Sequence, residues 1–237
     1  MDFEPYEIDT GPIEETVAFH DADEESLRQS VNHARAVKAR HRITLRRASS
    51  DQELSRLFPD FFDIGDSWHI ISGGDIDSLS YIAHIVDHEP LDYLLFSSWY
   101  LAADGVERLK HWVAEGKIGR LDAYVGEIFP NQYSDVFQML SEVVRASGCR
   151  VCVFRNHSKV FAGCNDRFAF AFAFAIESSA NINTNVRAEQ TAIHPSWELF
   201  HFYKDYFDAL TSVQPDFDRW TPYETRPRPE ADRPQAH

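Results

Sequence analysis

The sequence contains no uninterrupted run of about 18 apolar residues, the length that a helix needs to cross a bilayer. Its N-terminus, MDFEPYEIDTG, lacks the basic residues and the apolar stretch that mark a secretory signal. Only three cysteines are present, Cys149, Cys152 and Cys164, and this odd number without an export signal argues against a disulfide framework. We therefore predict a cytoplasmic protein that does not bind a membrane.

Basic residues are absent from the first 25 positions, which hold ten Asp or Glu. Most of the net charge of −15 belongs to this arm, so the other 212 residues carry only −5. A basic cluster without acidic residues follows between Gln29 and Ser50; its members are Arg35, Lys38, Arg40, Arg42, Arg46 and Arg47. We predict that Arg42, Arg46 and Arg47 contact a phosphate backbone, and a solvated helix face is the alternative.

Four segments are predicted along the 237 residues. They are an acidic flexible arm (1–22), a helical and basic segment (23–64), a catalytic domain (65–212) and a charged tail (213–237) with five of the eleven prolines. A globular fold is expected because hydrophobic residues make up 43% of the chain and aromatic residues 14%. The acidic arm and the Pro-rich tail are candidate contacts for a recruiting protein partner.

The domain opens with three strand–helix units. Each has a short apolar run (WHIISGG, LDYLLFSSWY, RLDAYVGEIF) followed by an amphipathic stretch (IDSLSYIAHIVDHE, GVERLKHWVAEGK, YSDVFQMLSEVVRASG). Such repetition predicts an α/β fold with a mixed, largely parallel sheet and helices on both of its faces. The SGGDIDS turn between the first strand and its helix is expected to line the site.

The pattern changes after Arg150. The stretches RVCVFRNHSKVFAG and FAFAFAFAI predict two strands of a hairpin with a turn at GCNDR, and TAIHP and SWELFHFYKDYFDAL predict a last strand and a closing helix. Period-2 alternation places the phenylalanines of FAFAFAFA on one face and the alanines on the other; these are Phe168, Phe170, Phe172 and Phe174. We expect this strand to be central and buried.

Polar residues cluster at the ends of these buried strands. His157 and Lys159 lie within the first hairpin strand, and Ser178, Ser179, Asn181 and Glu189 follow the second. Side chains of these types are costly to bury without partners, and sites in α/β sheets are built at strand ends. We therefore expect them to form one site.

The sequences HSK (157–159) and SSAN (178–181) resemble the H-x-K and G-S-x-N motifs of the phospholipase D superfamily, with Ser178 in place of Gly. The resemblance covers about residues 65–212. Glu189 stands where nucleases of this superfamily with a single H-x-K motif carry a glutamate. Cys164 stands where the family has an aspartate of mainly structural role.

The resemblance implies a phosphodiesterase that acts through a phosphohistidine on His157, without a metal or other cofactor. Lys159, Asn181 and Ser179 would donate to the phosphate oxygens, Ser178 would contact the substrate, and Glu189 would orient His157. The chain has one H-x-K and no internal repeat, so the second histidine is expected from a homodimer partner. We predict a nuclease, with DNA favoured over RNA. The alternatives are a binding or regulatory module with reduced catalysis and a phospholipid phosphodiesterase.

A second interpretation of this region is a zinc site. The spacing Cys149-x2-Cys152-x4-His157-x6-Cys164 approaches that of a zinc knuckle. Alternation from Arg150 onward places Cys149 and Cys152 on opposite faces of a strand, however, and we predict three buried thiols that pack as small apolar side chains.

Overall fold

Seven strands form one mixed sheet in the computed structural model, in the order β1-β7-β6-β5-β2-β3-β4. Their bounds are Trp68–Ser72 (β1), Tyr93–Ser98 (β2), Leu121–Gly126 (β3), Val151–Phe154 (β4), Val160–Asn165 (β5), Phe172–Ser178 (β6) and Glu189–His194 (β7). The structure describes residues 50–52, 54–56, 58, 66–146, 148–167, 171–183, 187–214 and 220–226, all within a compact unit that spans 43–237. The predicted acidic arm and Arg42, Arg46 and Arg47 lie outside the described residues.

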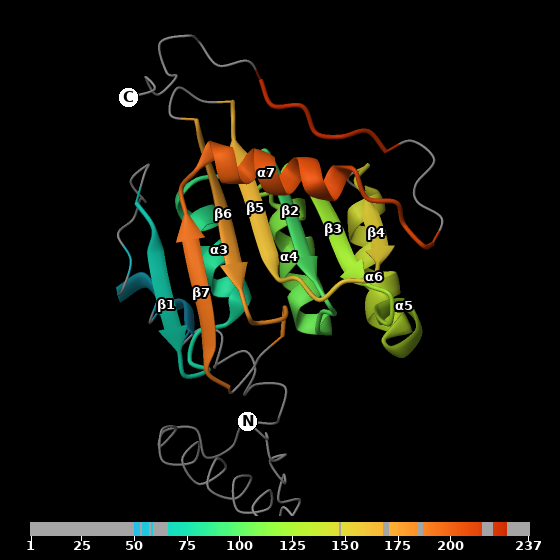
Figure 1. The fold of residues 1–237 in the computed structure, drawn as a ribbon, viewed down its shortest axis with the longest axis horizontal. Helices are drawn as coiled ribbons and strands as arrows, with labels where there is room; N and C mark the ends of the chain where they lie inside the picture. The colour runs from blue at the N-terminus through green and yellow to red at the C-terminus, as the bar shows by residue number, and fades with distance from the viewer. Residues whose placement is uncertain are drawn as a thin grey trace, which may run out of the picture. The chain divides into compact units, whose positions relative to one another are not determined.

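Helices cover both faces of the sheet, as predicted. Their bounds are Ser78–His88 (α3), Ala103–Ala114 (α4), Phe129–Gln132 (α5), Ser134–Ala146 (α6) and Trp197–Asp208 (α7). Figure 1 shows α7 crossing one face, while α3, α4 and α6 lie behind the sheet. Among the described residues, no helix has the length and apolar character needed to span a membrane.

Successive side chains of each strand point to opposite faces of the sheet, and a hydrophobic core lies on each face. Leu94 and Phe96 of β2 pack with the α3, α4 and α6 layer, whereas Tyr93 and Leu95 pack with the α7 layer. The phenylalanine pattern is confirmed where it is described, since Phe174 lies in the first core and Ala173 in the second. Phe168 and Phe170 lie outside the described residues.

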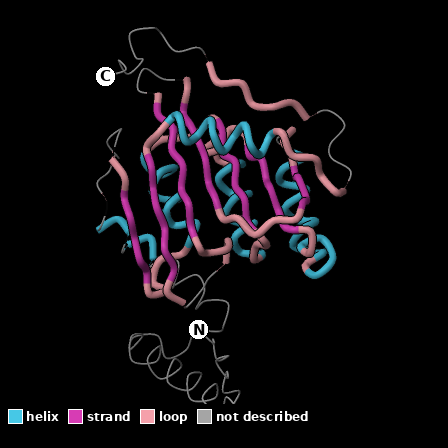
Figure 2. The backbone as a smooth tube through the Cα atoms, viewed as in Figure 1, coloured by secondary structure: helices cyan, strands magenta, loops and turns pink. Residues whose placement is uncertain are grey.

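The sheet is less parallel than predicted. Strands β2, β3 and β4 pair in parallel, but β1–β7, β7–β6, β6–β5 and β5–β2 are antiparallel pairs. Five strands (β1, β2, β3, β4 and β6) still run in one direction, as the strand–helix units require. Strands β5 and β7 run the other way and lie between them, so most neighbouring pairs are antiparallel, as the opposite arrows of β7 and its neighbours β1 and β6 show in Figure 1. Figure 2 shows the strands side by side in magenta, with helices in cyan on both faces.

The segment predicted as one strand from Arg150 to Gly163 is two strands. β4 lies at one edge of the sheet beside β3, and β5 lies in the centre between β2 and β6. Asn156 breaks the strand: its Nδ2 donates to Ser97 Oγ (2.9 Å) and Tyr124 O (3.2 Å), and its Oδ1 accepts from Ser158 N (2.8 Å). The hairpin itself is confirmed, but it joins β5 to β6, and Asn165 pairs with Phe172 across it.

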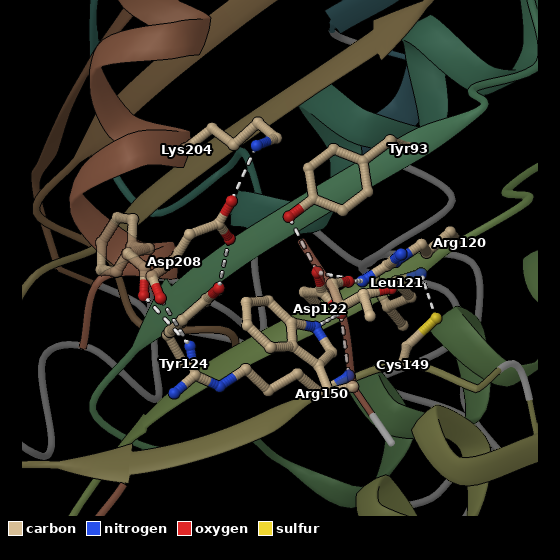
Figure 3. Close-up of polar contacts among 12 residues, drawn as sticks. Tyr93, Arg120, Leu121, Asp122, Tyr124, Cys149, Arg150, Lys204 and Asp208 are labelled. Carbon is tan, nitrogen blue, oxygen red and sulfur yellow. Dashed lines mark hydrogen bonds and ion pairs between the residues drawn. The ribbon is translucent and has the colours of Figure 1, made fainter. Parts of the chain in front are cut away.

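The start of β3 carries a buried carboxylate, Asp122. It accepts hydrogen bonds from Arg150 N (2.8 Å), Tyr93 Oη (2.9 Å) and Trp220 Nε1 (3.2 Å), and Arg120 Nη2 lies 3.4 Å away (Figure 3). Burial raises the pKa of Asp122, and the positive charge of Arg120 partly opposes this rise. These contacts connect β3 to Tyr93 of β2, to Arg150 just before β4, and to Trp220 much later in the chain.

Part of the predicted tail packs on the α7 side of the sheet. Tyr223 stacks on Tyr93 with 4.5 Å between ring centroids and 2° between planes, and the guanidinium of Arg150 lies 4.4 Å from the Trp220 ring centroid. Residues 220–226 have no regular secondary structure, and they form a strap whose Trp220 covers Asp122.

Candidate active site

The sheet topology brings the predicted catalytic residues to the same end of three neighbouring strands. β6 runs toward this end of the sheet and stops at Ser178, whereas β5 and β7 begin there, after Lys159 and at Glu189. Backbone hydrogen bonds fix the register, from Ser178 N to Lys159 O (2.9 Å) and from Ser179 N to Gln190 O (3.0 Å). Antiparallel pairing therefore explains why Lys159 meets Ser178, 19 positions later, and why Ser179 meets Gln190, 11 positions later.

His157 and Lys159 form a close pair. Lys159 Nζ lies 3.1 Å from His157 Nδ1 and 3.4 Å from Nε2, and it donates to His157 O at 2.6 Å. The His157 side chain is exposed, whereas Lys159 is only 7% exposed. The imidazole is thus open to a ligand, and the ammonium group approaches it from the protein side.

Burial lowers the pKa of Lys159, because removing the ammonium group from water disfavours its charged form. The carboxylate of Glu189 opposes this effect. Glu189 therefore helps to keep a buried cation charged at the site.

The Glu189 carboxylate also accepts a hydrogen bond from Ser179 Oγ, and the same oxygen of Ser179 accepts from Gln190 N (3.0 Å). This arrangement orients the exposed Ser179 hydroxyl at the edge of the sheet. The expected hydrogen bond between Glu189 and a ring nitrogen of His157 stays a prediction.

Asn181 is anchored through its oxygen atoms. Its Oδ1 accepts from Trp99 N (3.3 Å) and Ser98 Oγ (3.4 Å), and its backbone O accepts from Ser78 Oγ (3.1 Å). Because the carboxamide oxygen is engaged, the Nδ2 donor is the end that an anion would meet. Ser78, the last residue of the SGGDIDS turn, is also the first residue of α3, which has Asp77 as its N-cap, so this end of the turn borders Asn181.

Ser178 supports the turn that carries these residues. Its Oγ lies 2.9 Å from Thr191 Oγ1 and accepts from Ala180 N (3.1 Å). The Ser178 hydroxyl is therefore used within the protein. Its expected contact with a substrate stays a prediction.

Trp99 and Asn156 also belong to the site, and the sequence did not single them out. The Trp99 ring lies 5.5 Å from the His157 ring, and Asn156 precedes His157 and fixes the chain around it. The signal was present in SSWY, where polar and aromatic residues directly follow a buried strand. Motif spacing could not reveal their proximity to His157, because they come from another strand.

The zinc interpretation is wrong for this structure. Cys149 lies in the core on the α3, α4 and α6 side, whereas Cys152 and Cys164 lie in the core on the α7 side. All three thiols are buried, as predicted. Within the part of the chain that the structure describes, no group of three His, Cys, Asp or Glu is suited to hold a metal ion.

The sequence matches no family model and no curated protein. Among solved structures, the chain is similar to polyphosphate kinase from Porphyromonas gingivalis, with 15% identity and a TM-score of 0.46, over 60% of this chain and 25% of the kinase. It is also similar to TrmBL2, an archaeal chromatin protein with a novel mode of DNA binding, with 8% identity and a TM-score of 0.43, over 84% of this chain and 68% of TrmBL2. The chain thus spans a quarter of the kinase's length. Both TM-scores are below 0.5, and neither similarity supports a conclusion about function.

Proposed function

We propose that this protein is a phosphodiesterase that cleaves nucleic acid through a covalent intermediate on His157. The observation that carries the proposal is the grouping of three side chains at one end of the strands: the exposed imidazole of His157, the buried ammonium group of Lys159 and the anchored carboxamide of Asn181. The first of these is a nucleophile, and the other two are donors for an anion. The similarity of HSK and SSAN to the phospholipase D motifs supports the same chemistry.

Each residue has a role in the proposed reaction. A ring nitrogen of His157 attacks phosphorus, a P–N bond forms, and the P–O bond to the leaving group breaks. Lys159 Nζ and Asn181 Nδ2 donate to the non-bridging oxygens, where negative charge develops. Water then attacks the phosphohistidine, the P–N bond to His157 breaks, and the proton of this water passes to the histidine that protonated the leaving oxygen. The Glu189 carboxylate keeps Lys159 charged.

The leaving oxygen requires a proton, and one chain supplies one H-x-K histidine. A second copy of the chain would supply it, with the two His157 residues at a two-fold axis. His157 is exposed, which is compatible with such an approach. The proposed enzyme is therefore a homodimer, and DNA is the favoured substrate over RNA.

Incubation of the full-length protein with end-labelled DNA and RNA in EDTA tests this proposal. Wild type and His111→Ala should cleave, because His111 lies on the surface of α4 beside Glu115. His157→Ala should be inactive, and Asn181→Ala should be slower by about 10²–10³-fold, which is typical for the loss of one oxyanion donor. A labelled covalent adduct should form in the wild type and be absent from His157→Ala.

The other outcomes point to specific alternatives. Nucleic-acid binding without cleavage would select a regulatory module of the same fold, and cleavage of phospholipid but not of DNA or RNA would select a lipid phosphodiesterase. Cleavage retained in His157→Ala would overturn the proposed mechanism.

A further inference from the structure

An array of aromatic side chains lies beside the candidate active site, and we propose that it binds unpaired bases of a single-stranded nucleic acid. This inference rests on the proposed function, because it assigns the form of the substrate for the same site. The array consists of Trp99, Tyr100 and Tyr133, and we call it the aromatic ladder.

The aromatic ladder begins beside His157 and ends at Tyr133. The Trp99 ring lies 5.5 Å from His157, the Tyr100 ring 5.7 Å from Trp99, and the Tyr133 ring 5.1 Å from Tyr100. Tyr100 and Tyr133 are parallel within 9°, which is the geometry of stacked rings. Trp99 meets Tyr100 edge to face, with 73° between the ring planes, so the flat surface that the ladder offers to a base is the stacked pair of Tyr100 and Tyr133.

The ladder is held in position by residues of the site. Trp99 N donates to Asn181 Oδ1 (3.3 Å), and the Tyr100 hydroxyl accepts from Asn183 Nδ2 (2.7 Å), two residues after Asn181. Gly126 leaves room for the indole, since a Cβ at this position would lie 2.5 Å from Trp99 Cδ1. The rings and the donors for a phosphate are thus parts of one rigid arrangement.

The outer end of the ladder is accessible. Tyr133 is 40% exposed, and its inner neighbour Phe129 is fully buried and 6.1 Å away, so the ring is supported from the core. Trp99 and Tyr100 are half-buried. A core cluster would hide these rings, whereas a stacking platform presents a supported ring to solvent.

A cation accompanies the ladder. Burial is the main cause that raises the pKa of Tyr100, with a further rise from Tyr133, and the positive charge of Arg187 opposes both. Arg187 is exposed, and its charge acts on the Tyr100 hydroxyl. Aromatic rings beside an exposed cation are the combination by which proteins bind single strands, through stacking of bases and attraction of phosphates.

Single strands are favoured over duplexes for a physical reason. Bases in a duplex stack on each other and expose no face, whereas unpaired bases can stack on protein rings without that cost. The ladder begins next to His157, so a stacked base would hold its own phosphate near the nucleophile. The expected substrate is therefore a single-stranded segment, or a strand end that has separated.

Fluorescence anisotropy with labelled 12-nucleotide single strands, in DNA and RNA forms, tests the inference. Measurements use the full-length chain in a His157→Ala background, so that no probe is cleaved. Tyr133→Ala should weaken binding of both single strands by about 5- to 150-fold, the effect of losing one stacked base, and Tyr133→Phe should restore it. Tyr206→Ala, a tyrosine on α7 that is 56% exposed, is the matched control and should leave binding unchanged.

An abasic strand of equal length separates stacking from charge. It retains the phosphates, so Tyr133→Ala should leave its weaker binding unaltered. Equal binding of abasic, duplex and single-stranded probes, or equal loss with Tyr206→Ala, would overturn the inference. Failure of the proposed function is seen separately as absence of cleavage by the wild type, whereas failure of this inference alone leaves cleavage intact without base-dependent binding.

Discussion

Gly126→Ala tests the arrangement around His157 with a single methyl group. Gly126 is the last residue of β3 and lies next to Trp99; its N–H donates to Trp99 O (3.1 Å). An added Cβ would lie 2.5 Å from Trp99 Cδ1, 2.7 Å from Trp99 O and 3.3 Å from Asn156 O. Carbon atoms in contact normally lie about 3.5–4.0 Å apart, so the indole contact is too short by about 1 Å.

The size of the effect follows from these distances. Because one of the clashing atoms is backbone, rotation of a side chain cannot relieve the overlap, and Trp99 has to move with its chain. Overpacking of this kind costs about 1–3 kcal/mol of unfolding free energy. For a domain of this size, the melting temperature should fall by about 2–12 °C. A shift of about 1 Å in Trp99, which bonds Asn181 and contacts His157, should reduce cleavage by about 10²-fold.

Thermal unfolding and the cleavage assay measure both effects on the same samples. Gly73→Ala is the matched control, because no atom lies within 4 Å of its added Cβ and its backbone has no positive φ. The control should stay within about 0.5 kcal/mol of the wild type. A Gly126→Ala protein with wild-type melting temperature and wild-type cleavage would refute the packing of Trp99 on β3 and its connection to the site.

Two further predictions concern buried charges. Burial lowers the pKa of Lys159, and the negative charge of Glu189 opposes this effect. Glu189→Gln removes that charge, so the fall in cleavage rate at alkaline pH should move to lower pH. An alkaline fall at the wild-type pH would show that Glu189 does not act on Lys159. Asp122→Asn should lower the unfolding free energy by about 1–3 kcal/mol in urea titrations, because the new amide would face donors from Tyr93, Arg150 and Trp220. The pKa of Asp122 is higher in the folded protein than in the unfolded chain, where it is about 3.9. The stability that this difference contributes is therefore present below a pH of about 3.9 and is lost as the pH rises through the pKa of the folded state. The Asn variant should lack this dependence, and a wild-type pH profile in the variant would contradict the assignment.

Local periodicity in the sequence determined most of the secondary structure. Alternation in YLLFSS and FAFAI separates side chains between the two faces of a strand, and the structure assigns them to two different cores. Gly148 follows the C-terminus of α6 with a φ of 68°, which glycine adopts without strain. The polar residues at the ends of β5, β6 and β7 were also visible in the sequence, because their types are costly to bury without partners.

Strand order was decided by contacts that no local pattern contains. β1 precedes a helix like the first strand of a parallel unit, yet it lies at the sheet edge and pairs with β7, more than 110 residues later. The break at Asn156 likewise depends on acceptors from β2 and β3. Side-chain alternation is the same for parallel and antiparallel neighbours, so it could not distinguish these arrangements.

The candidate site shows the same division. The sequence singled out the proposed nucleophile His157 and the proposed donors Lys159 and Asn181, because chemistry restricts which residue types serve an anionic substrate. Only the tertiary structure placed Trp99 against His157 and Trp220 against Asp122, since these pairs are joined by sheet pairing and by the strap and not by spacing. The cause is physical: local sequence sets backbone propensity and the face of each side chain, whereas contacts between distant segments depend on the joint burial of surfaces that form only when the whole sheet is assembled.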